Sequence, residues 1–138
     1  MKYEMKQEYF LGIEKIDTQH ARLLELMDEA HSLLKDENKL YKCADIRKIL
    51  AGIKEYVNFH FTDEEQYMQE IGYTGLEEHK KLHQAFAIKV DEFDVHVSNL
   101  SLGTQDGMIL ELLDYLKAWI QEHICEEDRK YVSQTDNR

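Results

Sequence analysis

The segment from residue 46 to residue 71, IRKILAGIKEYVNFHFTDEEQYMQEI, gives the strongest indication of the fold. Its apolar residues recur every three or four positions, which is the period of an amphipathic α-helix. The segment ends at Gly72, and glycine commonly follows the last turn of a helix. The apolar residues of this stripe are Ile46, Ile49, Leu50, Ile53, Val57, Met68 and Ile71.

Three further segments have the same period, and they predict helices over residues 16–34, 76–97 and 109–120. The chain has no proline and only six glycines, so little of its sequence suits the turns of β-rich folds. Four amphipathic helices with short connections predict an all-α protein, an up-down-up-down four-helix bundle.

The chain of 138 residues has the length of one domain, so we predict a single domain over residues 1–138. Residues 1–15 have no helical period and are predicted to form an extended N-terminal arm packed on the bundle. The predicted bundle covers about residues 16–132. The expected anchors of the arm are Tyr9, Phe10, Leu11 and Ile13.

The composition excludes several classes of partner. Its 28 acidic and 17 basic residues give a net charge of −11, which disfavours nucleic acids and anionic lipids. No stretch approaches the roughly 18 uninterrupted apolar residues of a membrane-spanning helix. Two cysteines, Cys43 and Cys125, without a secretory signal predict reduced thiols and a cytoplasmic location. The composition identifies no protein partner.

Ionisable residues interrupt all four apolar stripes at positions that should face the core. Burying a histidine without partners costs a few kcal/mol, and burying an unpaired carboxylate costs more. A neighbouring hydrogen bond would explain one such histidine, but it does not explain several on four helices. Imidazoles with carboxylates and no thiolate predict a site for iron, manganese or zinc. The residues are His20, His60, Glu64, His79, His83 and His123.

A further carboxylate ligand is expected after His123, and helical geometry leaves its identity open. Glu127 follows His123 by four residues and would share its helix face. Asp128 follows by five, about 140° around a regular helix, and would face inward only if a π-bulge or fraying distorts the turn.

Four motifs of this sequence resemble those of the hemerythrin family, in particular its single-domain bacterial members. The family pattern reads I-D-x-Q-H, H-F-x-x-E-E-x-x-M, H-x-x-x-H and H-x-x-x-x-D. Residues 16–20, 60–68, 79–83 and 123–128 match it in order. The resemblance favours Asp128 over Glu127, and Glu64 over Glu65. The chain departs from the family at Met5, where a tryptophan is frequent, and at Thr74, where a proline is frequent.

The resemblance implies two iron ions joined by an oxo or hydroxo bridge. It assigns three histidines to one ion and two to the other, with both carboxylates bridging, so that one ion keeps an open position. It implies reversible dioxygen binding for storage, transport or delivery, without enzymatic activity, in a pocket walled by Trp119 and Ile120. The implied ligands are His79, His83 and His123, then His20 and His60, and the bridging Glu64 and Asp128.

Three other functions remain open from the sequence. They are a di-iron oxygen or redox sensor, a di-iron peroxidase or nitric oxide reductase, and a bundle that binds metal only for stability. The remaining acidic residues near the motifs are expected to be solvated. No ligand role is expected for His31, His96, Cys43, Cys125 or Tyr131.

Overall fold

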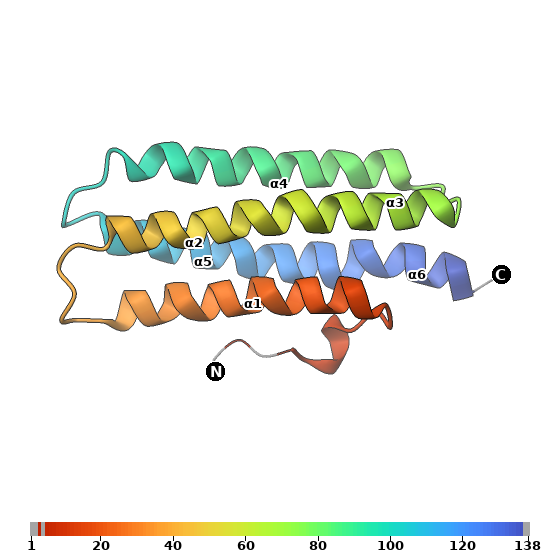
Figure 1. The fold of residues 1–138 in the computed structure, drawn as a ribbon, viewed down its shortest axis with the longest axis horizontal. Coiled ribbons are helices and arrows are strands. Elements are labelled where there is room, and N and C mark those ends of the chain that lie inside the picture. Colours follow the sequence, from red (N-terminus) through yellow and green to blue (C-terminus); the bar gives the residue numbers. More distant parts are fainter. Residues whose placement is uncertain (1–2, 4, 137–138) are drawn as a thin grey trace.

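The computed structural model describes Tyr3 and residues 5–136, which form a bundle of four long antiparallel helical rods (Figure 1). No strand occurs among these residues, so the predicted all-α, up-down-up-down bundle is confirmed. The first and third rods are α1 (Glu14–Lys35) and α4 (Leu76–Val97). The second consists of α2 (Cys43–Tyr56), the π-helical turn η2 (Val57–Phe61) and α3 (Thr62–Glu70). The fourth consists of α5 (Gln105–Trp119), the π-helical segment η3 (Ile120–Glu127) and α6 (Asp128–Asp136).

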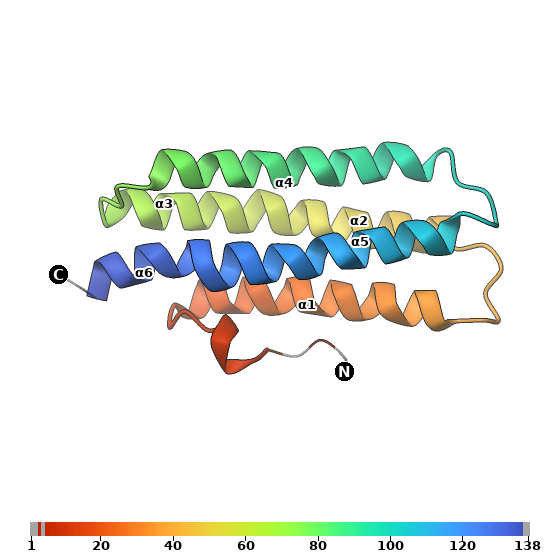
Figure 2. The same cartoon turned by 180° about the vertical axis from the view of Figure 1, so that it is seen from behind.

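The four rods enclose one interior. Helix α1 packs on α2 and α5, and α2 packs on α4. The rings of Phe86 and Phe93 in α4 contact Tyr115 of α5, so the third rod packs on the fourth. Figure 2 shows the rods from behind, with α5 and α6 in front. No helix of the described residues is long and apolar enough to cross a membrane, as the sequence predicted.

The second rod ends at Gly72, as predicted. Gly72 has φ +69°, a conformation that glycine adopts without steric cost. Its amide donates to the carbonyl of Gln69, and the amide of Tyr73 donates to the carbonyl of Met68. These two hydrogen bonds form a Schellman motif, which satisfies carbonyls that the end of the helix leaves open.

The N-terminal arm packs along the bundle, but not through all the expected anchors. It contains one 3-10 turn, η1 (Gln7–Tyr9). Leu11 is buried, whereas Phe10 is 48% exposed, so the prediction that Phe10 anchors the arm is wrong. The carboxylate of Asp17 holds the end of the arm by accepting hydrogen bonds from the amides of Leu11 and Gly12 at 2.8 and 3.1 Å.

The apolar core has two parts with a polar layer between them. The larger cluster includes Leu23, Tyr56, Phe86 and Trp119, one from each rod. The smaller cluster consists of Leu11, Ile16, Met68 and Tyr131. Along the first, second and fourth rods, the predicted ligands lie between a residue of the larger cluster and a residue of the smaller one. On α4 they lie between Phe86 of the larger cluster and Leu76, which packs against the smaller one. The fold therefore encloses a polar layer between two apolar blocks.

Candidate metal centre

All seven predicted ligands are buried in the polar layer, and their side chains converge. Asp128 and Glu64 have no exposed surface, and none of the five histidines is more than 3% exposed. Glu64, Asp128 and three histidines each place one donor atom within 4.8 Å of all the others. These histidines are His79, His83 and His123.

A second set of donors overlaps the first. His20 and His60, together with Glu64 and Asp128, also place their donor atoms within 4.8 Å of one another. The two sets therefore differ in their histidines and share both carboxylates. A carboxylate has two oxygen atoms, so each shared side chain can face both sets at once.

The π-helical segment η3 determines which acid of the fourth rod faces inward. The amide of Asp128 donates to the carbonyl of His123, five residues earlier, which is the hydrogen bond of a π-helix. This wider turn brings positions five apart onto one side of the rod, so Asp128 lies with His123. Glu127 is partly exposed and pairs with Lys130 at 2.9 Å. The distortion that Asp128 requires is therefore present.

The donor geometry fits metal ions. Two ligands at right angles, with bonds of about 2.1 Å, lie about 3 Å apart around an ion. The Nε2 atoms of His20 and His60 are 3.1 Å apart, as are those of His83 and His123. Both oxygens of Asp128 lack a hydrogen-bond partner among the described residues, although three imidazole Nε2 atoms lie 2.9, 3.0 and 3.4 Å from them.

The charge of the site also suits cations. Burial and the charge of Glu64 act to raise the pKa of Asp128, but the imidazoles of His123 and His20 lower that pKa to about 2. Burial likewise opposes ionisation of Glu64, and the surrounding imidazoles hold its pKa well below the usual range. Both carboxylates are therefore anions at neutral pH, as metal ligands must be.

Comparison with known proteins assigns the chain to a family. The family described as "Hemerythrin HHE cation binding domain" matches residues 11–134. The chain belongs to the hemerythrin family. The resemblance found in the four motifs is thereby confirmed. Family membership and the buried cluster together identify an iron-binding domain.

Individual relatives cover most of the chain. A bacteriohemerythrin of Clostridium acetobutylicum is 42% identical over 127 residues, which are 92% of this chain and 96% of the relative. A bacteriohemerythrin of Pseudomonas aeruginosa is 32% identical over 121 residues, covering 88% of this chain and 73% of the relative. A hemerythrin of Themiste dyscrita is 31% identical over 106 residues, covering 77% and 80%.

Aromatic rings hold three of the imidazoles in this hemerythrin domain. Tyr56 stacks on His60 with ring centroids 4.8 Å apart, and Phe61 stacks on His83 at 3.8 Å. Trp119 stacks on His123 at 3.9 Å, with 10° between the ring planes. Flat contacts of this kind restrict rotation of the imidazoles and exclude water from their faces.

Two residues outside the predicted set hold imidazoles through Nδ1. The Oε1 atom of Gln19 lies 2.6 Å from Nδ1 of His60, and Oε2 of Glu65 lies 2.8 Å from Nδ1 of His83. The expectation that acids next to the ligands are solvated is therefore wrong for Glu65. Hydrophobic periodicity contains no signal for such contacts, because the acceptor and the histidine lie on different rods.

Tyr131 is not one of the predicted ligands, but it contacts one of them. Its ring is fully buried in the smaller core cluster, and its hydroxyl donates to Oε2 of Glu64 at 3.1 Å. Burial and the nearby carboxylates raise the pKa of Tyr131, so the hydroxyl keeps its proton and acts as a donor. It therefore orients one of the two shared carboxylates.

The other histidines and both cysteines lie outside the two donor sets. His31 is half-buried with its ring edge toward Tyr3, and His96 is exposed. Cys43 and Cys125 are half-buried free thiols. Burial and the nearby charge of Glu8 raise the pKa of Cys125, which favours the neutral thiol over a metal-binding thiolate.

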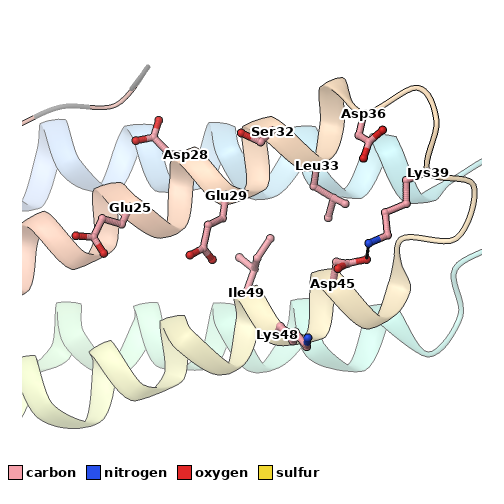
Figure 3. A pocket seen from close by; sticks show the side chains of 10 residues that line it. All are labelled: Glu25, Asp28, Glu29, Ser32, Leu33, Asp36, Lys39, Asp45, Lys48 and Ile49. Atoms are coloured by element: carbon pink, nitrogen blue, oxygen red, sulfur yellow. Dashed lines mark ion pairs between the residues drawn. The ribbon is translucent and has the colours of Figure 1, made fainter.

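One cavity is bordered by a predicted ligand, and two others are lined by other residues. A cavity of about 210 Å³ lies between the arm and the bundle, lined by residues that include Leu24, Met27 and Ile120. Another of about 410 Å³ is bordered by Gln19 and His60. The cavity of about 600 Å³ in Figure 3 lies between α1 and α2, has acidic side chains for half of its lining residues and contains none of the predicted ligands.

The metal-free protein should lose stability as the pH rises from 6.5 to 9. Burial acts to lower the pKa of His79, but Asp128 and Glu64 raise it to about 9. A folded-state pKa above the unfolded value of 6.5 stabilises the fold fully below pH 6.5, and this contribution disappears as the pH passes 9. The raised pKa of His123 acts in the same sense. Burial lowers the pKa of His60, so this residue has the opposite effect on stability, but only below pH 6.5.

The expected loss from His79 is up to about 3 kcal/mol in the free energy of unfolding. Urea unfolding of chelator-treated protein across this pH range measures it. The iron-loaded protein is the control and should not show the loss, because metal binding requires neutral imidazoles. A flat profile for the metal-free protein would contradict the prediction.

Proposed function

We propose that this domain binds two iron ions and uses them to bind dioxygen reversibly, for storage, transport or delivery in the cytoplasm. The supporting observation is the pair of overlapping donor sets that share Glu64 and Asp128. One ion would need only one set. Two sets with common carboxylates suit two ions a short distance apart. The free thiols of both cysteines support the cytoplasmic location.

In this proposal each donor set holds one ion. His79, His83 and His123 would hold the first, His20 and His60 would hold the second, and Glu64 and Asp128 would be shared by both. When bound, the iron pair supplies two electrons to dioxygen and recovers them when dioxygen leaves. The protein supplies the ligands, their orientation and the exclusion of water.

The unequal number of ligands supports binding of an external molecule. The first set offers five protein donors and the second offers four. A metal ion that serves only structure has its positions filled by protein, whereas one that binds a ligand keeps a position open. The side of the site that His20 and His60 would hold is therefore the side proposed to have room for an external molecule.

The kind of donor supports reversible binding over oxidation chemistry. Di-iron bundles of the ferritin-like class use mostly carboxylates, in the pattern of glutamates with Glu-x-x-His. Here five imidazoles, which are neutral when they bind metal, accompany only two carboxylates. Negative charge on the donors stabilises the higher oxidation states of iron. A donor set with fewer carboxylates stabilises them less, and it therefore favours return to the reduced form. We therefore propose that the domain is a carrier and not an enzyme.

A dry pocket is the second requirement for reversibility, because water and protons would promote irreversible oxidation. Trp119 is 9% exposed and Ile120 is 4% exposed, and both precede His123 on the fourth rod. Trp119 covers one face of that imidazole, and Ile120 borders the cavity of about 210 Å³ under the arm. We propose that both residues wall the dioxygen pocket.

Replacing Ile120 with alanine should speed autoxidation of the dioxygen-bound protein while leaving its iron content unchanged. The substitution removes apolar bulk from the wall of the cavity, three residues before His123, so water should gain access to the site. The decay of the dioxygen-bound absorption spectrum in air measures the rate. The matched control is Ile109→Ala, another buried isoleucine of the same rod that lies in the larger core cluster. Equal rates in both variants would remove Ile120 from the pocket.

The proposed function is tested by absorption spectra of the anaerobically reduced, iron-loaded protein. Spectra are recorded before dioxygen is added, after it is added and after it is removed, with iron per chain measured on the same sample. Two irons per chain and a band that appears with dioxygen and disappears on its removal are expected. A single irreversible change would overturn reversible binding and favour a redox enzyme or a sensor. No response would favour a structural metal.

A further inference from the structure

We propose that Glu65 is a positioning residue whose carboxylate makes the iron bound by three histidines the more easily oxidised of the two. The inference rests on the proposed function, because it requires an iron ion in each donor set. Glu65 is not a ligand in this proposal. It acts through the imidazole of His83.

The contact between Glu65 and His83 determines which nitrogen of the imidazole faces the ions. A carboxylate only accepts hydrogen bonds, so the Nδ1 atom of His83, 2.8 Å from Glu65, must carry the proton. The lone pair of Nε2 then faces the donor set, 3.0 Å from Glu64. Phe61 stacks on the ring with 1° between the two planes, which fixes its orientation.

The second donor set has a neutral counterpart of this contact. His60 donates from Nδ1 to the side-chain carbonyl of Gln19 at 2.6 Å. The amide nitrogen of Gln19 donates to Asp63 at 2.7 Å, and this assigns the carbonyl end to His60. Asp63 is itself paired with Lys15 at 3.3 Å. His83 and His60 therefore have the same tautomer, but only His83 has an anion against its Nδ1 atom.

The other three imidazoles do not remove this difference. The Nδ1 atoms of His20, His79 and His123 have no hydrogen-bond partner within the part of the chain that the structure describes. Among the Nδ1 contacts, only that of Glu65 adds a negative charge, and it adds it to the three-histidine set. An anion that pulls on the Nδ1 proton increases the electron density on Nε2, and its charge also favours the more positive iron(III).

The central test replaces Glu65 with glutamine, which keeps the length and an acceptor oxygen but removes the charge. The midpoint potential of the iron pair should rise, with the iron content unchanged. Spectroelectrochemical titration measures the potential. In the half-oxidised protein, Mössbauer spectra should show less preference of iron(III) for the three-histidine position. A tenfold change in the equilibrium constant for transfer of one electron corresponds to a shift of about 59 mV in the midpoint potential.

The matched control is Glu127→Gln. Glu127 is also adjacent in sequence to a shared carboxylate, but it pairs with Lys130 on the surface of α6. The Glu127→Gln variant loses the same charge as Glu65→Gln, but at a residue that contacts no imidazole. Its midpoint potential should therefore equal that of the unmodified protein. Equal potentials for Glu65→Gln and Glu127→Gln would overturn the inference.

A mirror variant tests the same idea at the second donor set. In the double variant Gln19→Glu with Asp63→Asn, the anion moves to the His60 side and the new amide can donate to it. The preference of iron(III) in the half-oxidised protein should then shift toward the two-histidine position. An unchanged preference would contradict the proposed role of the Nδ1 acceptor.

A readout that does not depend on dioxygen comes from the zinc-loaded, diamagnetic protein. The Nδ1 proton of His83 should resonate downfield of that of His60, and Glu65→Gln should move it upfield. Glu65→Ala, which removes the acceptor as well, should weaken metal binding by about 10- to 100-fold. If Glu65→Gln holds two irons per chain and its midpoint potential does not shift, the inference is wrong and the proposed function stands. If the unmodified protein holds fewer than two irons per chain, the proposed function is wrong.

Discussion

Replacing Asp128 with alanine should empty both positions of the proposed iron pair. Asp128 belongs to both donor sets and is completely buried, with imidazoles of three rods within 3.4 Å of its oxygens. Its loss would remove a ligand from each ion and leave Glu64 as the one carboxylate among the five imidazoles of the two donor sets. The iron content should fall from two per chain to less than one, with affinity reduced by at least about 100-fold. Metal analysis after loading and desalting measures both.

Glu127→Ala is the control for this prediction. Glu127 has the same charge and is the next residue on the rod, but its side chain pairs with Lys130. Its removal should leave two irons per chain. The opposite result, with iron lost in Glu127→Ala and retained in Asp128→Ala, would mean that the fourth rod is a regular helix through this region.

Replacing Phe86 with alanine should lower the free energy of unfolding by about 3–5 kcal/mol. The Phe86 ring is fully buried in the larger core cluster. It contacts Trp119 at 4.3 Å and Phe61 at 5.6 Å between ring centroids, and these rings stack on His123 and His83. The cavity would remove support from both imidazoles as well as apolar contact. Urea unfolding of the metal-free protein measures the loss.

The matched control for Phe86 is Ile88→Ala, two positions along the same helix. Ile88 is 60% exposed, so its truncation should change the free energy of unfolding by less than about 0.5 kcal/mol. Iron affinity should fall in Phe86→Ala and stay unchanged in Ile88→Ala. Equal stabilities of the two variants would contradict the packing of Phe86 beneath the metal site.

The helices could be predicted because their signal is local. The apolar period of each stripe follows from which face of the helix meets the core, and Gly72 marks an end through its own backbone freedom. The arm was harder to predict. It has no period, so nothing in its sequence distinguishes buried Leu11 from exposed Phe10.

The site was predictable to the extent that its residues break a local pattern. Histidines and Glu64 on apolar stripes stand out, because an unpaired polar group in a core is costly. Asp128 does not stand out, since a regular helix places Glu127 in its position. Only the hydrogen bond from the amide of Asp128 to the carbonyl of His123 shows the wider turn. The family resemblance supplied the choice that helical geometry left open.

The helical bundle and the types of donor in its interior follow from the sequence, because helical period and residue chemistry are properties of short segments. How the donors combine depends on the packing of the rods. The two sets that share Glu64 and Asp128, and the contacts of Gln19 and Glu65 with imidazoles of other rods, depend on distances between helices. Those distances are set by the packing of four rods together, so no single segment of the chain contains them.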